Sequence, residues 1–426
     1  MKKFFILFIL IIFTDKIQSQ NHEELIEGPF ETLQEVTETC LGCHDGIGEE
    51  VLASRHWNWK SSDKSFFYNK SLSYEFRVAP NSDLSINQFN HVSFYSKENP
   101  NDVNNIDCLI CHEQTGTYSK YTKNYDIVKV AQSVKKPNRK NCGTCHFDSN
   151  KGTDIRHGDL DKSLIKPGKN IDVHMGGKNF NCTNCHTSKG HKIAGADSKN
   201  ISCMNCHNDK THKSPTLNKH IKNVACETCH ITEFAKENPT KIYIDWSKSK
   251  SEKSFENNSI TASKIKPKYL WSDGTDKFYN TGDKIDSKSA AVLVKPDGNI
   301  SNPKAKIYPF KLVKGKIPFD EANNYLIAAK VNGNSGLAKT NNWNSSAEIG
   351  MKEMELAFSG KVSFIEAESY FSLNHMVSPK EEALKCTQCH GVKGEKILNW
   401  KELGYSGDPM RTKGREKNKL LKISKK

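Results

Sequence analysis

The chain has 426 residues, a length that ordinarily corresponds to two or three domains. Only 35% of the residues are hydrophobic and the mean hydropathy is -0.69, which is too polar for a conventional side-chain core of that size. The formal net charge of +14 and the pI near 9.0 raise the question of a nucleic-acid or anionic membrane partner.

The N-terminus has the pattern of a secretory signal. Lys2 and Lys3 precede an apolar run over residues 4–13. Ten apolar residues are too few to span a bilayer, which needs about 20. We therefore expect a signal peptide over residues 1–20, with an uncleaved N-terminal anchor as the alternative, and a periplasmic or otherwise exported protein. We expect no transmembrane segment beyond it.

One short motif accounts for every cysteine. All 14 cysteines fall into seven Cys-x-x-Cys-His motifs, and no cysteine is left over. The motifs are Cys40, Cys43 and His44; Cys108, Cys111 and His112; Cys142, Cys145 and His146; Cys182, Cys185 and His186; Cys203, Cys206 and His207; Cys226, Cys229 and His230; and Cys386, Cys389 and His390.

The spacing of this motif is that of covalent haem attachment. Two thiols three residues apart can form thioethers to the vinyl groups of one haem, and the next imidazole then reaches the iron. Disulfides, redox-active cysteine pairs and zinc sites explain paired cysteines, but none requires a histidine after every second cysteine. The sequence predicts seven covalently bound haem c groups.

Seven haems also account for the composition and the charge. Each macrocycle is a large apolar plate that can fill an interior lacking side chains. Each carries two propionates, about -14 in total, which would bring the holoprotein near neutrality. We therefore expect no nucleic-acid partner, and we interpret the lysine-rich end of the chain as a solvated tail.

Motif density divides the chain into a signal peptide (1–20), a haem-rich region with six motifs (21–230), a haem-free insertion of loops, strands and helices packing on the haem core (231–385), and a C-terminal motif with a basic tail (386–426). Within the insertion, 241–246 and 307–313 favour short strands, and 345–358, 363–371 and 380–385 favour helices. We expect a mainly α fold with extensive loops, organised around packed haems.

Nine histidines outside the motifs are candidates for the second axial position on the irons, since two histidines are expected for a haem that only transfers electrons. We expect His22, at the start of the mature chain, to have no such role, and His91 is treated separately. The remaining seven match the irons in number: His56, His157, His174, His191, His212, His220 and His375. Met175 and Met376 are weaker alternatives.

Longer stretches of the chain resemble the octahaem tetrathionate reductase family of cytochromes c, which is similar in haem arrangement to hydroxylamine oxidoreductase. The matching residues are 40–44, 55–59, 107–112, 115–118, 141–147, 157–160, 172–175, 190–195, 218–220, 239–246, 374–379 and 400–410.

The chain departs from the family at one haem. The resemblance implies eight haems, and the second motif should fall between Cys43 and Cys108. In register with it stands Asn87-Gln88-Phe89-Asn90-His91, where asparagines replace both cysteines. In the family, this haem is the substrate site.

The resemblance also implies a distal lysine at the substrate haem. It corresponds to Lys120, with Lys123 as the fallback. A nearby free cysteine of the family has no counterpart here, and Arg77 occupies its place.

We expect the first of three functions and keep the other two as alternatives. First, the catalytic haem is lost and the protein transfers electrons between redox partner proteins, or from a quinol-linked donor. Second, His91 and Lys120 hold an eighth, non-covalent haem that reduces small sulfur or nitrogen oxyanions or hydroxylamine. Third, the haems mainly shape a scaffold within a membrane-associated electron-transfer complex.

Overall fold

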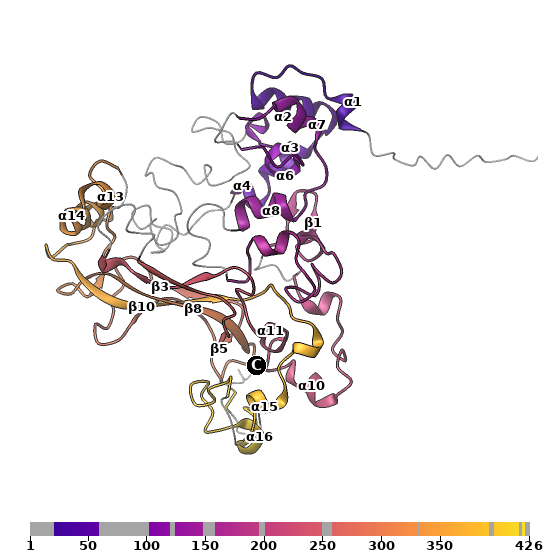
Figure 1. Cartoon of the computed structure of the whole chain (residues 1–426). Helices are drawn as coiled ribbons and strands as arrows, with labels where there is room; N and C mark the ends of the chain where they lie inside the picture. Colours follow the sequence, from indigo (N-terminus) through magenta and orange to yellow (C-terminus); the bar gives the residue numbers. More distant parts are fainter. Residues whose placement is uncertain are drawn as a thin grey trace, which may run out of the picture.

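The computed structural model describes residues 21–58, 102–119, 124–147, 158–195, 201–248, 258–330, 333–391, 396–416 and 420–421. The predicted signal peptide lies outside these residues. Figure 1 shows two parts: short helices of the first half of the chain follow one another in a column, and strands of the second half form a sheet to one side of it.

The upper part of the column consists of short helices, several of which are capped by side chains. The Thr32 hydroxyl accepts a hydrogen bond from the Glu35 amide at the start of α2, and Asn138 forms a capping box with Asn141 at the start of α8. The elements are α1 (His22–Leu25), α2 (Leu33–Cys43), α3 (Ile47–Leu52), α4 (Arg55–Asn58), η4 (Val103–Asn105), α6 (Leu109–His112), α7 (Ile127–Gln132) and α8 (Arg139–His146).

The lower part of the column contains single turns and little regular structure. Its elements are η5 (Lys162–Ile165), η6 (Cys182–Asn184), β1 (Ser188–Lys189), β2 (Lys192–Ile193), η7 (Cys203–Asn205), α10 (Pro215–His220) and α11 (Cys226–His230). The chain returns to this end after the sheet with η9 (Lys380–Glu382), α15 (Cys386–Cys389) and α16 (Pro409–Thr412).

The sheet has eight strands among the described residues, in the order β4-β3-β8-β10-β7-β6, with β5 and β9 also paired to β8. It is mixed, because β8 is antiparallel to β10 and parallel to β3. The strands are β3 (Thr240–Asp245), β4 (Ser259–Ala262), β5 (Lys268–Ser272), β6 (Asp276–Phe278), β7 (Ala291–Pro296), β8 (Lys306–Asp320), β9 (Tyr325–Leu326) and β10 (Ser363–Ser372); η8 (Trp246–Lys248) follows β3.

A side-chain core lies between this sheet and two helices, α13 (Leu337–Thr340) and α14 (Trp343–Glu353). Ala347 and Met351 of α14 are fully buried in the same hydrophobic cluster as Ile317 of β8 and Leu326 of β9. This half of the molecule therefore has the conventional core that the overall composition did not suggest.

The expected mainly α fold is wrong, because the large mixed sheet forms where few strands were predicted. Residues 363–371, expected to be helical, form β10, in which Ile365, Ala367 and Ser369 are buried in strict alternation. Their apolar residues fit a helical period as well as a strand period over so short a segment, and pairing with β8 decides between them.

The other local predictions fared unevenly. Strand predictions at 241–246 and 307–313 correspond to β3 and to part of the much longer β8. The helix expected at 345–358 corresponds to α14, whereas 380–385 contains only the single turn η9. Within the described ranges, no helix is both long and apolar enough to cross a membrane.

Candidate haem centres

Each Cys-x-x-Cys-His motif folds into one helical turn. The backbone amide of the motif histidine donates to the carbonyl of the first cysteine in five of them, at 2.8–3.2 Å. A helical turn places residues i, i+3 and i+4 on the same side. Both thiols and the imidazole of a motif are therefore directed to one side of the chain.

Every motif histidine lies opposite a histidine from outside the motifs. Among the described residues, seven such ring pairs have centres 6.1–6.4 Å apart. The pairs are His44 with His22, His146 with His56, His112 with His191, His207 with His174, His186 with His375, His230 with His212, and His390 with His220.

This spacing fits a shared metal ion. Two imidazole nitrogens, each about 2 Å from one ion on opposite sides, place the ring centres about 6 Å apart. The interplanar angles run from 17° to 84°. Rings in direct contact would change their separation with this angle, but these pairs do not. The constant distance and variable angle indicate that the rings are spaced by a common partner and not by contact with each other.

The structure also orients several of these rings through Nδ1. The Nδ1 atoms of His112, His186 and His220 lie 2.8–2.9 Å from main-chain carbonyl oxygens. A carbonyl only accepts, so Nδ1 carries the proton and Nε2 keeps the lone pair that a metal ion needs. His212 has an amide oxygen in this place, from Asn218.

Three further rings have a carboxylate at Nδ1. Glu50 lies 3.1 Å from His191, Asp159 lies 3.2 Å from His375, and Asp408 lies 2.6 Å from His390. The sequence did not predict these carboxylate partners, because each lies far along the chain from its histidine and the two leave no local sequence pattern.

Burial disfavours the charged form of several of these histidines. Desolvation lowers the pKa of His56, His112 and His230 below the usual value. His375 differs: burial opposes its charge, but the hydrogen bond and the negative charge of Asp159 outweigh burial and raise its pKa.

The structure departs from the predicted ligand set in one place. His22, expected to have no role, lies opposite His44, whereas His157 lies outside the described residues. The number of histidines exceeded the number of motifs, so counting could not choose between them. Met376 is fully buried in a cluster with Phe147, Leu164 and Ile171. His91, Lys120, Lys123 and Arg77 lie outside the described residues.

Successive motifs adjoin through their thiols. Cys40 lies beside Cys108, Cys142 beside Cys182, and Cys203 beside Cys226, close enough for each thiol to shift the pKa of its neighbour. The second cysteines of successive motifs also lie close enough to interact electrostatically. These pairs are Cys111 with Cys145, Cys185 with Cys206, and Cys229 with Cys389. Each motif is therefore next to the following one, from the first to the last.

The thiols do not resemble those of a zinc or disulfide site. All 14 are free, and no group of three or more His, Cys, Asp or Glu side chains within the described part of the chain gathers as a metal site. Burial raises the pKa of Cys111 to about 12 and that of Cys229 to about 11, whereas the neighbouring Cys203 lowers the pKa of Cys226 to about 7.

The interior around the motifs is not filled by side chains. Between residues 173 and 224, none of the described residues is buried, although five of the histidine pairs draw members from this stretch. An apolar plate between each pair of rings would supply the missing interior, and the adjacent thiols would attach it. Fold and site together define a multihaem cytochrome c with covalently bound haem.

The comparisons agree with this class. The family model described as "Cytochrome c bacterial" matches residues 245–393. A crystal structure of an octaheme cytochrome c from Shewanella oneidensis has 35% sequence identity to this chain and a TM-score of 0.79, and the match covers 93% of this chain and 99% of that one. The chain belongs to the multihaem cytochromes c of the octahaem tetrathionate reductase type.

A more distant relative matches only in part. An uncharacterized protein from Archaeoglobus fulgidus is 26% identical over 121 residues, which cover 23% of this chain. The match spans 40% of that protein's length.

Proposed function

We propose that the protein carries seven covalently bound haems, each with two axial histidines, and that it transfers electrons along them. The observation that carries this proposal is the set of seven histidine pairs with ring centres 6.1–6.4 Å apart, each containing one motif histidine. Two imidazoles favour a low reduction potential and fill both axial positions, as suits electron transfer without substrate binding at the iron.

The proposed axial ligands follow the pairs. His22 replaces His157 in the set, and His56, His174, His191, His212, His220 and His375 keep the role expected from the sequence. The carbonyl, amide and carboxylate partners at Nδ1 fix the rings, so that little structural change accompanies the gain or loss of an electron.

The contacts between thiols support a route in sequence order. When bound, each haem accepts and releases one electron. The chain's own residues would hold neighbouring haems close together, because the attachment cysteines of consecutive motifs lie near enough to affect each other's pKa. The motif-bearing elements run from α2 at one end of the column in Figure 1 to α15 at the other. Electrons would therefore enter and leave at the Cys40 and Cys386 ends.

The setting follows from the sequence pattern. We propose that the protein is exported through the signal at residues 1–20, and that its partners are redox proteins or a quinol-linked donor. The sheet of residues 240–372 would then act as the haem-free insertion that supports the haem-bearing column.

The test is haem stoichiometry combined with spin state. Holoprotein from a host with c-type maturation would be measured by intact mass under denaturing conditions, by total haem, and by electron paramagnetic resonance. Seven covalent haems, seven in total and all low-spin would support the proposal. Fewer than seven covalent haems would contradict it.

The same measurement tests the reductase alternative at His91 and Lys120. A total of eight haems with seven covalent would favour a non-covalent substrate haem, and reduction of tetrathionate, nitrite and hydroxylamine would then be assayed.

A further inference from the structure

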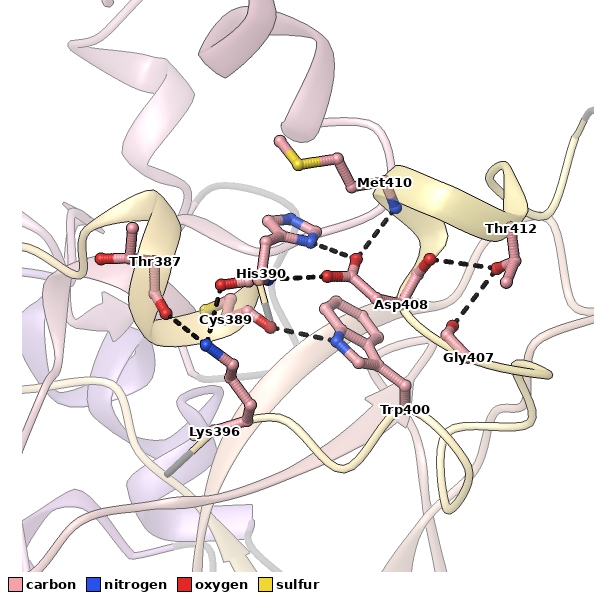
Figure 2. Close-up of polar contacts among 10 residues, drawn as sticks. Thr387, Cys389, His390, Lys396, Trp400, Gly407, Asp408, Met410 and Thr412 are labelled. Carbon is pink, nitrogen blue, oxygen red and sulfur yellow. Dashed lines mark hydrogen bonds and ion pairs between the residues drawn. The ribbon is translucent and has the colours of Figure 1, made fainter. Parts of the chain in front are cut away.

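The histidine of the last motif is held by a carboxylate with both oxygens engaged. Asp408 Oδ1 lies 2.6 Å from His390 Nδ1 and accepts from the Met410 amide at 2.9 Å, while Oδ2 accepts from the Gly391 amide at 2.9 Å (Figure 2). The His390 and Asp408 side chains are 14% and 11% exposed. The carboxylate therefore has one fixed position, directed at the ring.

The rest of the surroundings also fix the ring. Trp400 stacks on His390 with ring centres 5.2 Å apart and an interplanar angle of 18°, and its Nε1 donates to the Cys389 carbonyl (Figure 2). Lys396 Nζ donates to the carbonyls of Thr387 and His390, which holds the motif turn. His220 lies on the far side, 6.2 Å away.

This contact differs from the other Nδ1 contacts of the described histidines. It is the shortest of those that involve a carboxylate. Glu50, at 3.1 Å from His191, is 44% exposed, so water screens its charge. Asp159 Oδ2 lies 3.2 Å from His375 Nδ1 and also accepts from two amides, those of Asn374 and His375, whereas Asp408 Oδ1 is shared with one amide, that of Met410.

We propose that Asp408 is a positioning residue that lowers the reduction potential of the haem attached at Cys386 and Cys389. This inference rests on the proposed function, in which His390 and His220 bind that iron. A carboxylate that accepts the Nδ1 proton's hydrogen bond makes the imidazole a stronger electron donor, and stronger donation stabilises the ferric over the ferrous state.

The redox change itself is simple. One electron converts ferric to ferrous iron, no bond is broken, and the proton stays on Nδ1. The fixed negative charge, in surroundings largely closed to water, opposes the added electron more strongly than it would in solvent. The haem at the C-terminal end of the route therefore has a lower reduction potential.

The test is the Asp408→Asn variant of the holoprotein, with its haem potentials measured by optical redox titration and its ferric signals by electron paramagnetic resonance. We expect one of the titration steps to rise, with the equilibrium constant for reduction increasing about tenfold, which is about 59 mV for one electron. One low-spin ferric signal should change with it.

Two further variants complete the design. Asp408→Glu keeps the charge but displaces the oxygen from Nδ1, and should raise the potential of the same titration step by less. If the asparagine variant loses its seventh haem, the potential of the glutamate variant tests the role of Asp408 instead. Glu402→Gln removes a charge from the same segment, where the Glu402 carboxylate pairs with Lys268 at 2.7 Å, and should leave every step in place.

The outcomes separate the two proposals. Wild-type protein without seven low-spin haems contradicts the proposed function. A complete haem set whose titration is unchanged by Asp408→Asn and Asp408→Glu, or shifted equally by Glu402→Gln, overturns the role of Asp408 alone.

Discussion

The ring of His22, in the first helix, lies 6.2 Å from the ring of His44, in the first motif, with an interplanar angle of 27°. The separation is the same as in the other six histidine pairs. His22 therefore lies opposite a motif histidine as the partners in the other six pairs do, although it precedes its partner on a separate helix and nothing in the local sequence marks it.

Replacing His22 should open one iron. We expect His22→Ala to convert one of the seven haems from low-spin to high-spin and to make it bind carbon monoxide, because no second imidazole would fill the axial position. The electron paramagnetic resonance spectrum and the carbon monoxide difference spectrum report this. His157→Ala is the matched comparison and should leave all haems low-spin. The reverse pattern would assign the ligand to His157.

Loss of haem should affect the two halves of the molecule differently. The described residues between 173 and 224 have no buried side chain, whereas the sheet encloses its own hydrophobic cluster. In protein made without c-type maturation, we expect proteases to cut within 173–224 and to spare 240–372. Limited proteolysis followed by mass spectrometry identifies the fragments. Equal cleavage of both regions would mean that the sheet also depends on haem.

The packing of α14 on the sheet should be sensitive to volume. Met351 is fully buried, and its sulfur lies 3.2 Å from the Ala328 amide. We expect Met351→Ala to lower the free energy of unfolding by about 2–5 kcal/mol, because it leaves a cavity. Urea unfolding measures the change. Met410→Ala, at a side chain that is 69% exposed, is the control and should cost little.

Asp320 should make the sheet sensitive to acid. Asp320 is fully buried, and burial by itself would raise the pKa of its carboxyl group. Hydrogen bonds from Asn323 and Ser359 outweigh this effect and lower the pKa below its usual value. A carboxyl with a lowered pKa in the folded state stabilises the protein above its unfolded pKa of about 3.9, and this stabilisation is lost as the pH falls through the folded pKa.

The corresponding variant is Asp320→Asn. We expect it to cost about 2 kcal/mol at pH 7, with the difference from wild type shrinking below about pH 4. Urea unfolding across this pH range tests it, with the exposed neighbour Glu321→Gln as control. A difference that stays constant down to pH 2 would exclude an ionised Asp320 as the cause.

Secondary structure was predictable from the sequence only where the spacing of the apolar residues fitted either a helix or a strand but not both. The apolar run at 241–246 indicated a strand and lies within β3 and the turn after it. Residues 363–371 were misassigned, because Phe364, Ile365 and Ala367 fit a helix or a strand equally well. The ladder that pairs Ile365 with Ile317 buries one face of the segment, and only a strand satisfies it.

The sequence by itself indicated that this chain attaches haem and predicted the residues that would do so, because attachment is a local reaction of two thiols and one imidazole within five residues. Only the tertiary structure decided which histidine faces which motif. His186 and His375, or His44 and His22, meet through long-range packing, and the buried Asp159 holds His375 in place. The sheet was decided in the same way, since strand pairing depends on partners far apart in the chain.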